Sequence, residues 1–360
     1  MSKVISMVEA LRLKGAPVTA EVINSVAKGF IMANDRSLLV ENGGYISLSY
    51  QWGRNVLYKM EKEGKKMCRR KATTEKIPIA PGLLREAKLN FQRQIKELQE
   101  WHQIPDDLII NFDQTPLSYV CSPNHTLHLK GGKSVPIVGK GKSKQITGTF
   151  SCTMSGLFLP MQLIYQGKTN RCHPVGIDFP EGFNITHSKN HWSNEDKVIE
   201  LLEEIIFAYA ESKRDELGLE QDQKCLLIFD VFKGQCTDRV LDLMNKNNCV
   251  TVFVPPNLTH VFQPLDLVIN GVAKSFLKNK FSEWYSQEIT QALEKGQDIH
   301  DVKIETTLTV MKPIHAKWVI GLYDRLRNDT DLIKKSFVEA GITAAIQEEI
   351  EPKDPYADLD

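Results

Sequence analysis

The sequence predicts an α/β protein with a mixed sheet flanked by helices, preceded by a small all-α domain. Short runs rich in Ile, Val, Leu and Phe recur between residues 108 and 254, and they read as strands. The first strands form a hairpin pattern and the later ones alternate with helical patterns, an order typical of a mixed sheet with helices on its faces. Residues 1–60 hold three short helical patterns with tight connections, which predicts a helix-turn-helix unit.

Composition and charge exclude several classes of protein. The 360 residues allow a full core and two domains, and 25% charged with 42% hydrophobic residues is ordinary for a globular chain. The formal net charge is +0, so the overall charge indicates no partner. Seven scattered Cys without a CxxC pair indicate buried thiols in a reducing compartment, rather than a disulfide framework or a zinc site. No apolar run approaches the roughly 18 residues of a membrane span, so we expect no membrane partner.

Three of the predicted strands lead to an aspartate. The run 108–112 ends at Asp113, the run 225–229 ends at Asp230, and Asp266 follows the run 249–254 in the first turn of a predicted helix. We expect a loop after Asp113. Three carboxylates at one rim of a sheet supply the oxygen ligands and the negative charge that hold a hard divalent cation.

Basic charge concentrates at the end of the predicted helix-turn-helix unit. Residues 54–76 hold nine basic and three acidic side chains, which leaves +6 in a chain that is neutral as a whole. Such a strip suits contact with the phosphates of double-stranded DNA. Two short clusters in it, Lys65-Lys66 and Arg69-Arg70-Lys71, also match a nuclear-import signal. The alternative is a solvated linker with ordinary surface charge. The candidate DNA contacts in this strip are Arg54, Lys59, Lys65, Lys66, Arg69, Arg70 and Lys71.

A second group of lysines precedes the predicted hairpin. Lys140, Lys142 and Lys144 lie in a segment that partly mimics a P-loop, but Pro136 stands where the first glycine is required, so nucleotide binding is rejected. Either these lysines follow a DNA backbone beside the carboxylates, or they belong to a plain solvated loop.

Several motifs of this chain resemble DDE transposases of the pogo and Tigger lineage, in the mariner superfamily, with their jerky and centromere protein B relatives. The motifs are Asn111-Phe112-Asp113-Gln114-Thr115-Pro116, Lys144-Gln145-Ile146-Thr147, the run 159–168, Asp230-Val231-Phe232-Lys233-Gly234-Gln235, and Asn257-Leu258-Thr259-His260 with Gln263-Pro264-Leu265-Asp266. The last two carboxylates are 36 positions apart (266 − 230), which fits the catalytic spacing of the family. Tyr50-Gln51-Trp52-Gly53-Arg54-Asn55 and Arg69-Arg70-Lys71-Ala72-Thr73-Thr74 resemble the family's second helix-turn-helix.

The resemblance implies a domain organisation. Residues 1–76 are expected to form a helix-turn-helix DNA-binding domain of the centromere protein B type, and residues 77–105 a linker helix. Residues 106–345 are expected to form a ribonuclease H-like DDE catalytic domain, followed by an acidic tail over 346–360. The family usually has an additional helix-turn-helix before this one, and we expect that unit to be missing here.

The resemblance also implies an activity. Asp113, Asp230 and Asp266 are expected to be the catalytic residues and to bind two Mg²⁺ or Mn²⁺ ions, with which the protein cleaves DNA and transfers the freed strand. We therefore expect a transposase-derived DNA-binding protein in the nucleus, and the resemblance also allows a homo-oligomer. The alternative is a domesticated nuclear DNA-binding protein without nuclease activity.

Overall fold

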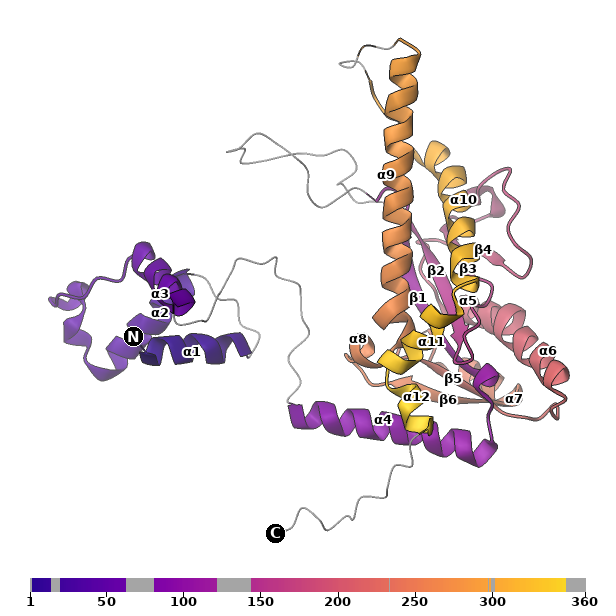
Figure 1. Ribbon diagram of the computed structural model, residues 1–360, viewed down its shortest axis with the longest axis horizontal. Helices are drawn as coiled ribbons and strands as arrows, with labels where there is room; N and C mark the ends of the chain where they lie inside the picture. Colours follow the sequence, from indigo (N-terminus) through magenta and orange to yellow (C-terminus); the bar gives the residue numbers. More distant parts are fainter. Residues whose placement is uncertain are drawn as a thin grey trace. The chain divides into compact units, whose positions relative to one another are not determined.

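The computed structural model describes residues 2–13, 20–62, 81–121, 144–232, 234–296, 298 and 302–347. The chain divides into two compact units, Met1–Arg85 and Glu86–Asp360. The boundary lies inside one helix, α4 (Pro81–His102). Figure 1 draws the elements of both units with the labels used below.

The first unit has three helices around one small core. They are α1 (Ser2–Leu13), α2 (Ala20–Asn34) and α3 (Tyr50–Lys62), with two 3₁₀ turns, η1 (Arg36–Leu38) and η2 (Val40–Asn42), between the last two. Val8, Ile23 and Val56 are fully buried and contribute one side chain from each helix. A Cβ at Gly53 would lie 2.5 Å from the carbonyl oxygen of Ala20, so glycine lets α3 cross close to the start of α2.

The second unit is built on one six-stranded sheet. Its strands are β1 (Ile109–Ser118), β2 (Gln145–Thr153), β3 (Gln162–Gln166), β4 (Asn184–Ser188), β5 (Cys225–Asp230) and β6 (Cys249–Val254). Their order is β4-β3-β2-β1-β5-β6. Strands β1, β2 and β3 pair antiparallel, whereas β4 pairs parallel with β3, and β5 and β6 continue parallel to β1. This is the predicted ribonuclease H-like mixed sheet.

Helices cover the sheet on both faces. As a result, β1 and β5 bury consecutive residues and not only alternate ones. After β4 come α5 (Glu195–Leu201), a π-helical stretch η5 (Leu202–Phe207) and α6 (Ala208–Leu217), and α7 (Asp238–Lys246) joins β5 to β6. After β6 come α8 (Thr259–Phe262), the π-helical turn η6 (Leu265–Ile269), α9 (Asn270–Glu294), α10 (Leu308–Arg327), α11 (Thr330–Glu339) and α12 (Ile342–Gln347). The long α9 packs side by side with α10 (Figure 1).

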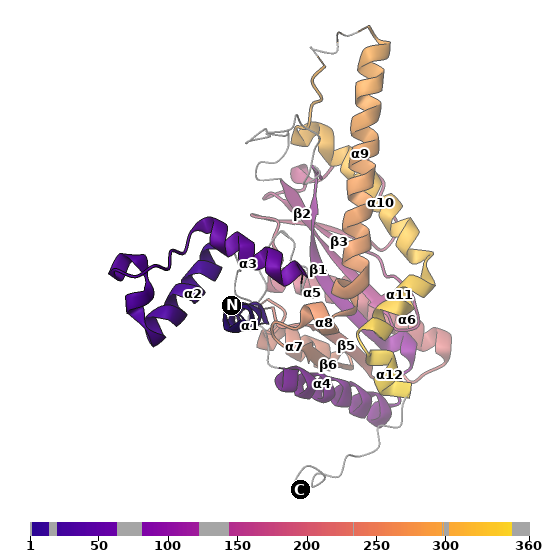
Figure 2. The same ribbon diagram turned by 60° about the vertical axis from the view of Figure 1, so that its left-hand side comes forward.

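Helix α4 lies within residues 77–105, where a linker helix was expected, and its second half packs within the larger unit. Phe91 stacks on Phe262 with ring centroids 5.4 Å apart, and the Gln92 amide donates to the Gly341 carbonyl at 2.8 Å. Both views show α4 running near α12 (Figures 1 and 2). The apolar face of α4 is therefore part of the core that backs the sheet.

Two strands differ from the sequence prediction. The loop expected after Asp113 is wrong, since β1 continues to Ser118 and pairs with β2 along its whole length from Ile110. The apolar run ends at Asp113, but the strand continues through polar residues and Pro116 because β2 pairs with it throughout. Pro116 is tolerated because β5 pairs only as far as Asn111, and beyond it β1 is an edge on that side. Strand β4 was not predicted at all. Its sequence Asn-Ile-Thr-His-Ser has no apolar run, and pairing with β3 alone makes it a strand.

The six cysteines that the structure describes are all free. Cys152, Cys225 and Cys249 are buried as expected, whereas the expectation of a buried thiol is wrong for Cys121, Cys172 and Cys236, which are half-buried. None of the described helices combines the length and the hydropathy that crossing a membrane requires.

Candidate active site

Two of the predicted aspartates lie on neighbouring parallel strands at the same level. The β1–β5 register pairs Ile109 with Leu226 and Asn111 with Ile228, an offset of 117 residues (226 − 109). The same offset relates Asp113 to Asp230 (230 − 113). Parallel strands in register carry equivalent residues to the same edge of a sheet, so these two side chains reach one site although 117 residues separate them.

The third aspartate comes from the π-helical turn η6. Asn111, a fully buried residue of β1, fixes this turn to the sheet: its Oδ1 accepts from the backbone nitrogen of Leu265 at 3.0 Å. The amide of the same side chain donates to the carbonyl of Ile228 on β5 at 2.8 Å. Asn111 thus joins the three elements that carry Asp113, Asp230 and Asp266.

Asn270, at the first residue of α9, connects two of the carboxylates. Its Nδ2 donates to Oδ2 of Asp113 at 2.7 Å and to Oδ1 of Asp266 at 2.9 Å. Asn270 is 3% exposed and Asp113 is 7% exposed, whereas Asp266 is open to solvent. The bridge therefore runs from the core outward, and it sets the relative position of the inner and outer carboxylates.

The electrostatics of the cluster converge on Asp113. Burial, and after it the charges of Asp266 and Asp230, raise the pKa of Asp113 to about 8. The hydrogen bonds from Asn270 and from the Gln114 backbone act against this rise. Uncompensated negative charge at a buried carboxylate is the condition that a bound cation relieves.

Gln235 connects Asp230 to Gln114. In the amide orientation that satisfies both ends of its side chain, Gln235 donates to Oδ1 of Asp230 at 2.9 Å and accepts from Nε2 of Gln114 at 3.2 Å. Gln235 is 1% exposed. A chain of amides therefore links Asp230 to the residue that follows Asp113.

The carboxylates and their amides form a donor set that fits hard divalent cations, which prefer oxygen ligands. Asn270 bridges Asp113 and Asp266, and Asp230 lies on the neighbouring strand, so the oxygen atoms of the three carboxylates are not all within 4.8 Å of one another. A pair of ions about 4 Å apart needs such a wider arrangement, since each ion takes ligands on its outer side.

Sequence reasoning missed the polar residues that hold the aspartates: Asn111, Gln235 and Asn270. One signal was available for Asn270, because residues four apart lie on the same face of a helix and Asn270 follows Asp266 by four positions. No sequence signal relates Asn111 to Leu265, since only the fold brings them together.

The candidate DNA contacts are only partly described. Arg54 and Lys59 are exposed on α3, and Lys144 is exposed just before β2. The other seven lie outside the described residues: Lys65, Lys66, Arg69, Arg70, Lys71, Lys140 and Lys142.

Residues 143–319 match the family described as DDE superfamily endonuclease. The chain carries a DDE endonuclease domain. The matched part of this DDE domain contains Asp230 and Asp266 and begins after Asp113.

Curated relatives confirm the predicted kinship with the pogo lineage. The chain is 24% identical over 354 residues to the human "Pogo transposable element with KRAB domain". The alignment covers 96% of this chain and 52% of that protein. It is 25% identical to the mouse protein of the same name, over 78% of the chain and 43% of that protein. The chain thus spans about half the length of these relatives.

A solved structure has a weaker likeness. The "Mos1 transposase paired-end complex with left transposon end" aligns with a TM-score of 0.43 at 10% identity, over 87% of this chain and 79% of that one. At that score it adds no weight to any assignment of function.

Proposed function

We propose that this chain is a transposase-derived DNA-binding protein whose DDE domain cleaves and transfers DNA strands with divalent metal ions. One observation carries the proposal. The side-chain amide of Asn270 donates to both Asp113 and Asp266, and the strand register brings Asp230 to the same edge of the sheet as Asp113. The three aspartates would bind two Mg²⁺ or Mn²⁺ ions. When bound, such ions activate a water molecule and stabilise the leaving alkoxide of a phosphodiester.

The chain's own groups would prepare this site. Asp113 holds a proton below about pH 8 without a cation, so it must release that proton before it becomes a ligand. Asn270 keeps Asp113 oriented toward Asp266, and Gln235 orients Asp230. These fixed positions lower the reorganisation that binding two ions would otherwise require.

We further propose that the first unit binds double-stranded DNA. Arg54 and Lys59 are exposed on α3, whereas Val56 and Met60 of the same helix are buried. A helix with a basic outer face followed by a basic segment suits contact with phosphates. A DNA substrate and a basic segment that matches an import signal both support action in the nucleus.

The test is nicking of supercoiled plasmid DNA by the full chain with Mg²⁺ or Mn²⁺. Substituting asparagine for Asp113, Asp230 or Asp266 should lower the rate by more than about 100-fold, since loss of residues that merely orient metal ligands already costs about 10–100-fold. Asp222→Asn is the matched control, because Asp222 is exposed in the turn before β5, and its rate should not change.

Three results would decide the matter. Cleavage that survives Asp230→Asn would refute the three-carboxylate site. Cleavage by the wild type that persists after chelation of all divalent metal would refute the use of metal. DNA binding by a wild type that never nicks, with either metal, would favour the alternative of a DNA-binding protein without nuclease activity.

A further inference from the structure

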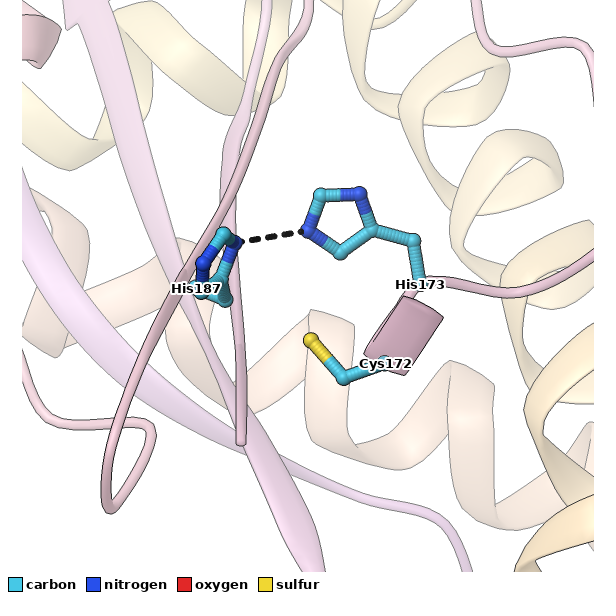
Figure 3. Close-up of side chains that lie close together, drawn as sticks. All are labelled: Cys172, His173 and His187. Atoms are coloured by element: carbon cyan, nitrogen blue, oxygen red, sulfur yellow. Dashed lines mark hydrogen bonds between the residues drawn. The ribbon is translucent and has the colours of Figure 1, made fainter. Parts of the chain in front are cut away.

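A second cluster of potential metal ligands lies at the opposite edge of the sheet from β6. Between β3 and β4 the chain makes an excursion over residues 167–183, which contains the 3₁₀ turn η4 (Asn170–Cys172). Cys172 and His173 come from the end of this turn, and His187 comes from β4. The sulfur and one nitrogen from each ring all lie within 4.8 Å of one another. Figure 3 shows the Cys172 thiol and the His173 ring directed toward His187.

The backbone is shaped to bring Cys172 into this cluster. A Cβ at Gly167 would lie 2.4 Å from the Cβ of Cys172 and 2.6 Å from its sulfur, so only glycine leaves room for the thiol. Lys312 of α10 donates to the Cys172 carbonyl at 2.6 Å and fixes the turn from the other side. The cluster therefore results from built contacts, and it is not a chance meeting of surface side chains.

The two histidines are also held in place. Nδ1 of His187 and Nε2 of His173 are 3.3 Å apart. The ring of His173 is hydrogen-bonded to the backbone of Thr186 and lies against the ring of Tyr165, with centroids 5.5 Å apart. A backbone bond to the second ring nitrogen is the usual way in which proteins orient a histidine ligand.

Tyr165 provides an independent sign of an additional group in the cluster. Its side chain is fully buried, and its hydroxyl has no hydrogen-bond partner in the described part of the chain. The hydroxyl is close enough to Cys172 for that thiol's charge to raise the pKa of Tyr165, after the larger effect of burial. A buried hydroxyl normally has a partner, and a thiolate ligand or a metal-bound water would provide one here.

We propose that Cys172, His173 and His187 bind one Zn²⁺ ion, with water as the fourth ligand. Sulfur and imidazole nitrogen are donors that zinc prefers and magnesium does not. In a tetrahedral zinc site with bonds of about 2.0–2.3 Å, ligand atoms are about 3.3–3.6 Å apart, which agrees with the 3.3 Å between the histidine nitrogens. On binding, the Cys172 thiol gives its proton to solvent and the sulfur donates its electron pair to the ion.

The charges around the cluster explain why the thiol is needed. Burial lowers the pKa of His173, and the neighbouring His187, Lys312 and Lys197 act in the same direction, which favours the neutral ring that can coordinate an ion. The same lysines oppose a bare cation, and the Cys172 thiolate offsets that repulsion. The ion would fasten the excursion to β4, the strand that pairs with β3 alone.

This site is separate from the aspartates and does not depend on the proposed nuclease. Strand β4 is three positions from β1 in the sheet, so about 14 Å separate the two sites across the strands alone. Zinc binding and magnesium-dependent cleavage can therefore fail or succeed independently.

The experiment uses the full chain, stripped with a chelator under reducing conditions and titrated with Co²⁺ and then with Zn²⁺. We expect one equivalent of Co²⁺ to give a thiolate-to-cobalt charge-transfer band with the intense visible bands of a four-coordinate site, and Zn²⁺ to displace it. Cys172→Ser should remove the charge-transfer band, and His187→Gln should weaken binding at least 10-fold. The matched controls Cys121→Ser and His102→Gln, which change residues outside the cluster, should leave the charge-transfer band unchanged.

A second measurement needs no variant. Bound Zn²⁺ should slow alkylation of Cys172 by iodoacetamide, read by mass spectrometry of the Cys172 peptide, while the half-buried Cys121 reacts at the same rate with and without zinc. Absence of the charge-transfer band in the wild type, its survival in Cys172→Ser, or alkylation of Cys172 that zinc does not slow would each overturn the proposal.

Discussion

Nδ2 of Asn270 lies 2.7 Å from Oδ2 of Asp113, and this hydrogen bond joins the first residue of α9 to the middle of β1 across 157 positions of the chain. The same nitrogen also donates to Asp266. A neutral amide thus holds two carboxylates that repel one another. This relationship makes the candidate site a preformed one, and it leads to the first two predictions.

Replacing Asn270 with alanine should raise the concentration of Mg²⁺ needed for half-maximal cleavage by about 10–100-fold, the usual cost of losing a residue that orients a metal ligand. The variant removes the amide that donates hydrogen bonds to both Asp113 and Asp266. Plasmid nicking across a Mg²⁺ titration checks it. Asn328→Ala is the control, since Asn328 is exposed and bonds only to the Asp324 backbone among the described residues. An unchanged Mg²⁺ requirement would remove Asn270 from the site.

The pKa of Asp113 predicts how stability depends on pH without metal. Asp113 keeps its proton to about pH 8 in the folded chain, whereas an unfolded aspartate loses its proton near about pH 4. The folded state therefore binds more protons in this window, and the free energy of unfolding falls as pH rises through it, by at most about 1.4 kcal/mol per pH unit.

Urea unfolding of the metal-free chain at several pH values checks this dependence. The isosteric variant Asp113→Asn lacks the titrating group, so its unfolding free energy should fall less steeply over the same window. Mg²⁺ should also bind the wild type more tightly as pH rises toward about 8, because binding displaces the Asp113 proton. Parallel pH profiles for the two proteins would contradict the assignment.

Asn111 should be a stability residue as well as a positioning one. Asn111→Ala leaves the Ile228 carbonyl and the Leu265 N–H without their side-chain partner. Two buried unpaired backbone groups and the small cavity should lower the free energy of unfolding by about 2–4 kcal/mol, measured by urea titration. Asn245→Ala on the exposed side of α7 should change it by less than about 0.5 kcal/mol. A similar small change for both variants would mean that η6 is not fixed to the sheet through Asn111.

The basic strip should contribute salt-dependent DNA affinity. Neutralising Arg69, Arg70 and Lys71 together should weaken binding to duplex DNA at low salt. The slope of the logarithm of the association constant against the logarithm of the salt concentration should also become shallower, by about 0.9 for each phosphate that the variant no longer neutralises. Fluorescence anisotropy of a labelled duplex over a salt series measures both quantities. Lys28→Ala should have little effect, since Glu41 already pairs with Lys28 at 2.8 Å. Equal slopes for the wild type and the triple variant would assign the strip to an ordinary solvated linker.

The sequence alone determined the sheet class, the order of its main elements and the kinship with pogo-type DDE proteins. Apolar runs of strand length, helical periodicity and short motifs are local properties, so they survive without knowledge of the fold. The same local signals misplaced the end of β1, because the apolar run ends at Asp113 while pairing with β2 continues the strand to Ser118. They also missed β4, whose polar residues become a strand only by pairing with β3.

Only the tertiary structure decided which side chains meet. Asp113 and Asp230 share a level of the sheet because of strand register, and Asn111 reaches Leu265 across 154 positions of the chain. The cysteine spacing indicated no zinc site, since Cys172 stands far from any other cysteine; its neighbours in the cluster are His173 and His187. Local patterns fix what each segment becomes, whereas contacts between distant segments depend on register and packing, and those are properties of the folded chain as a whole.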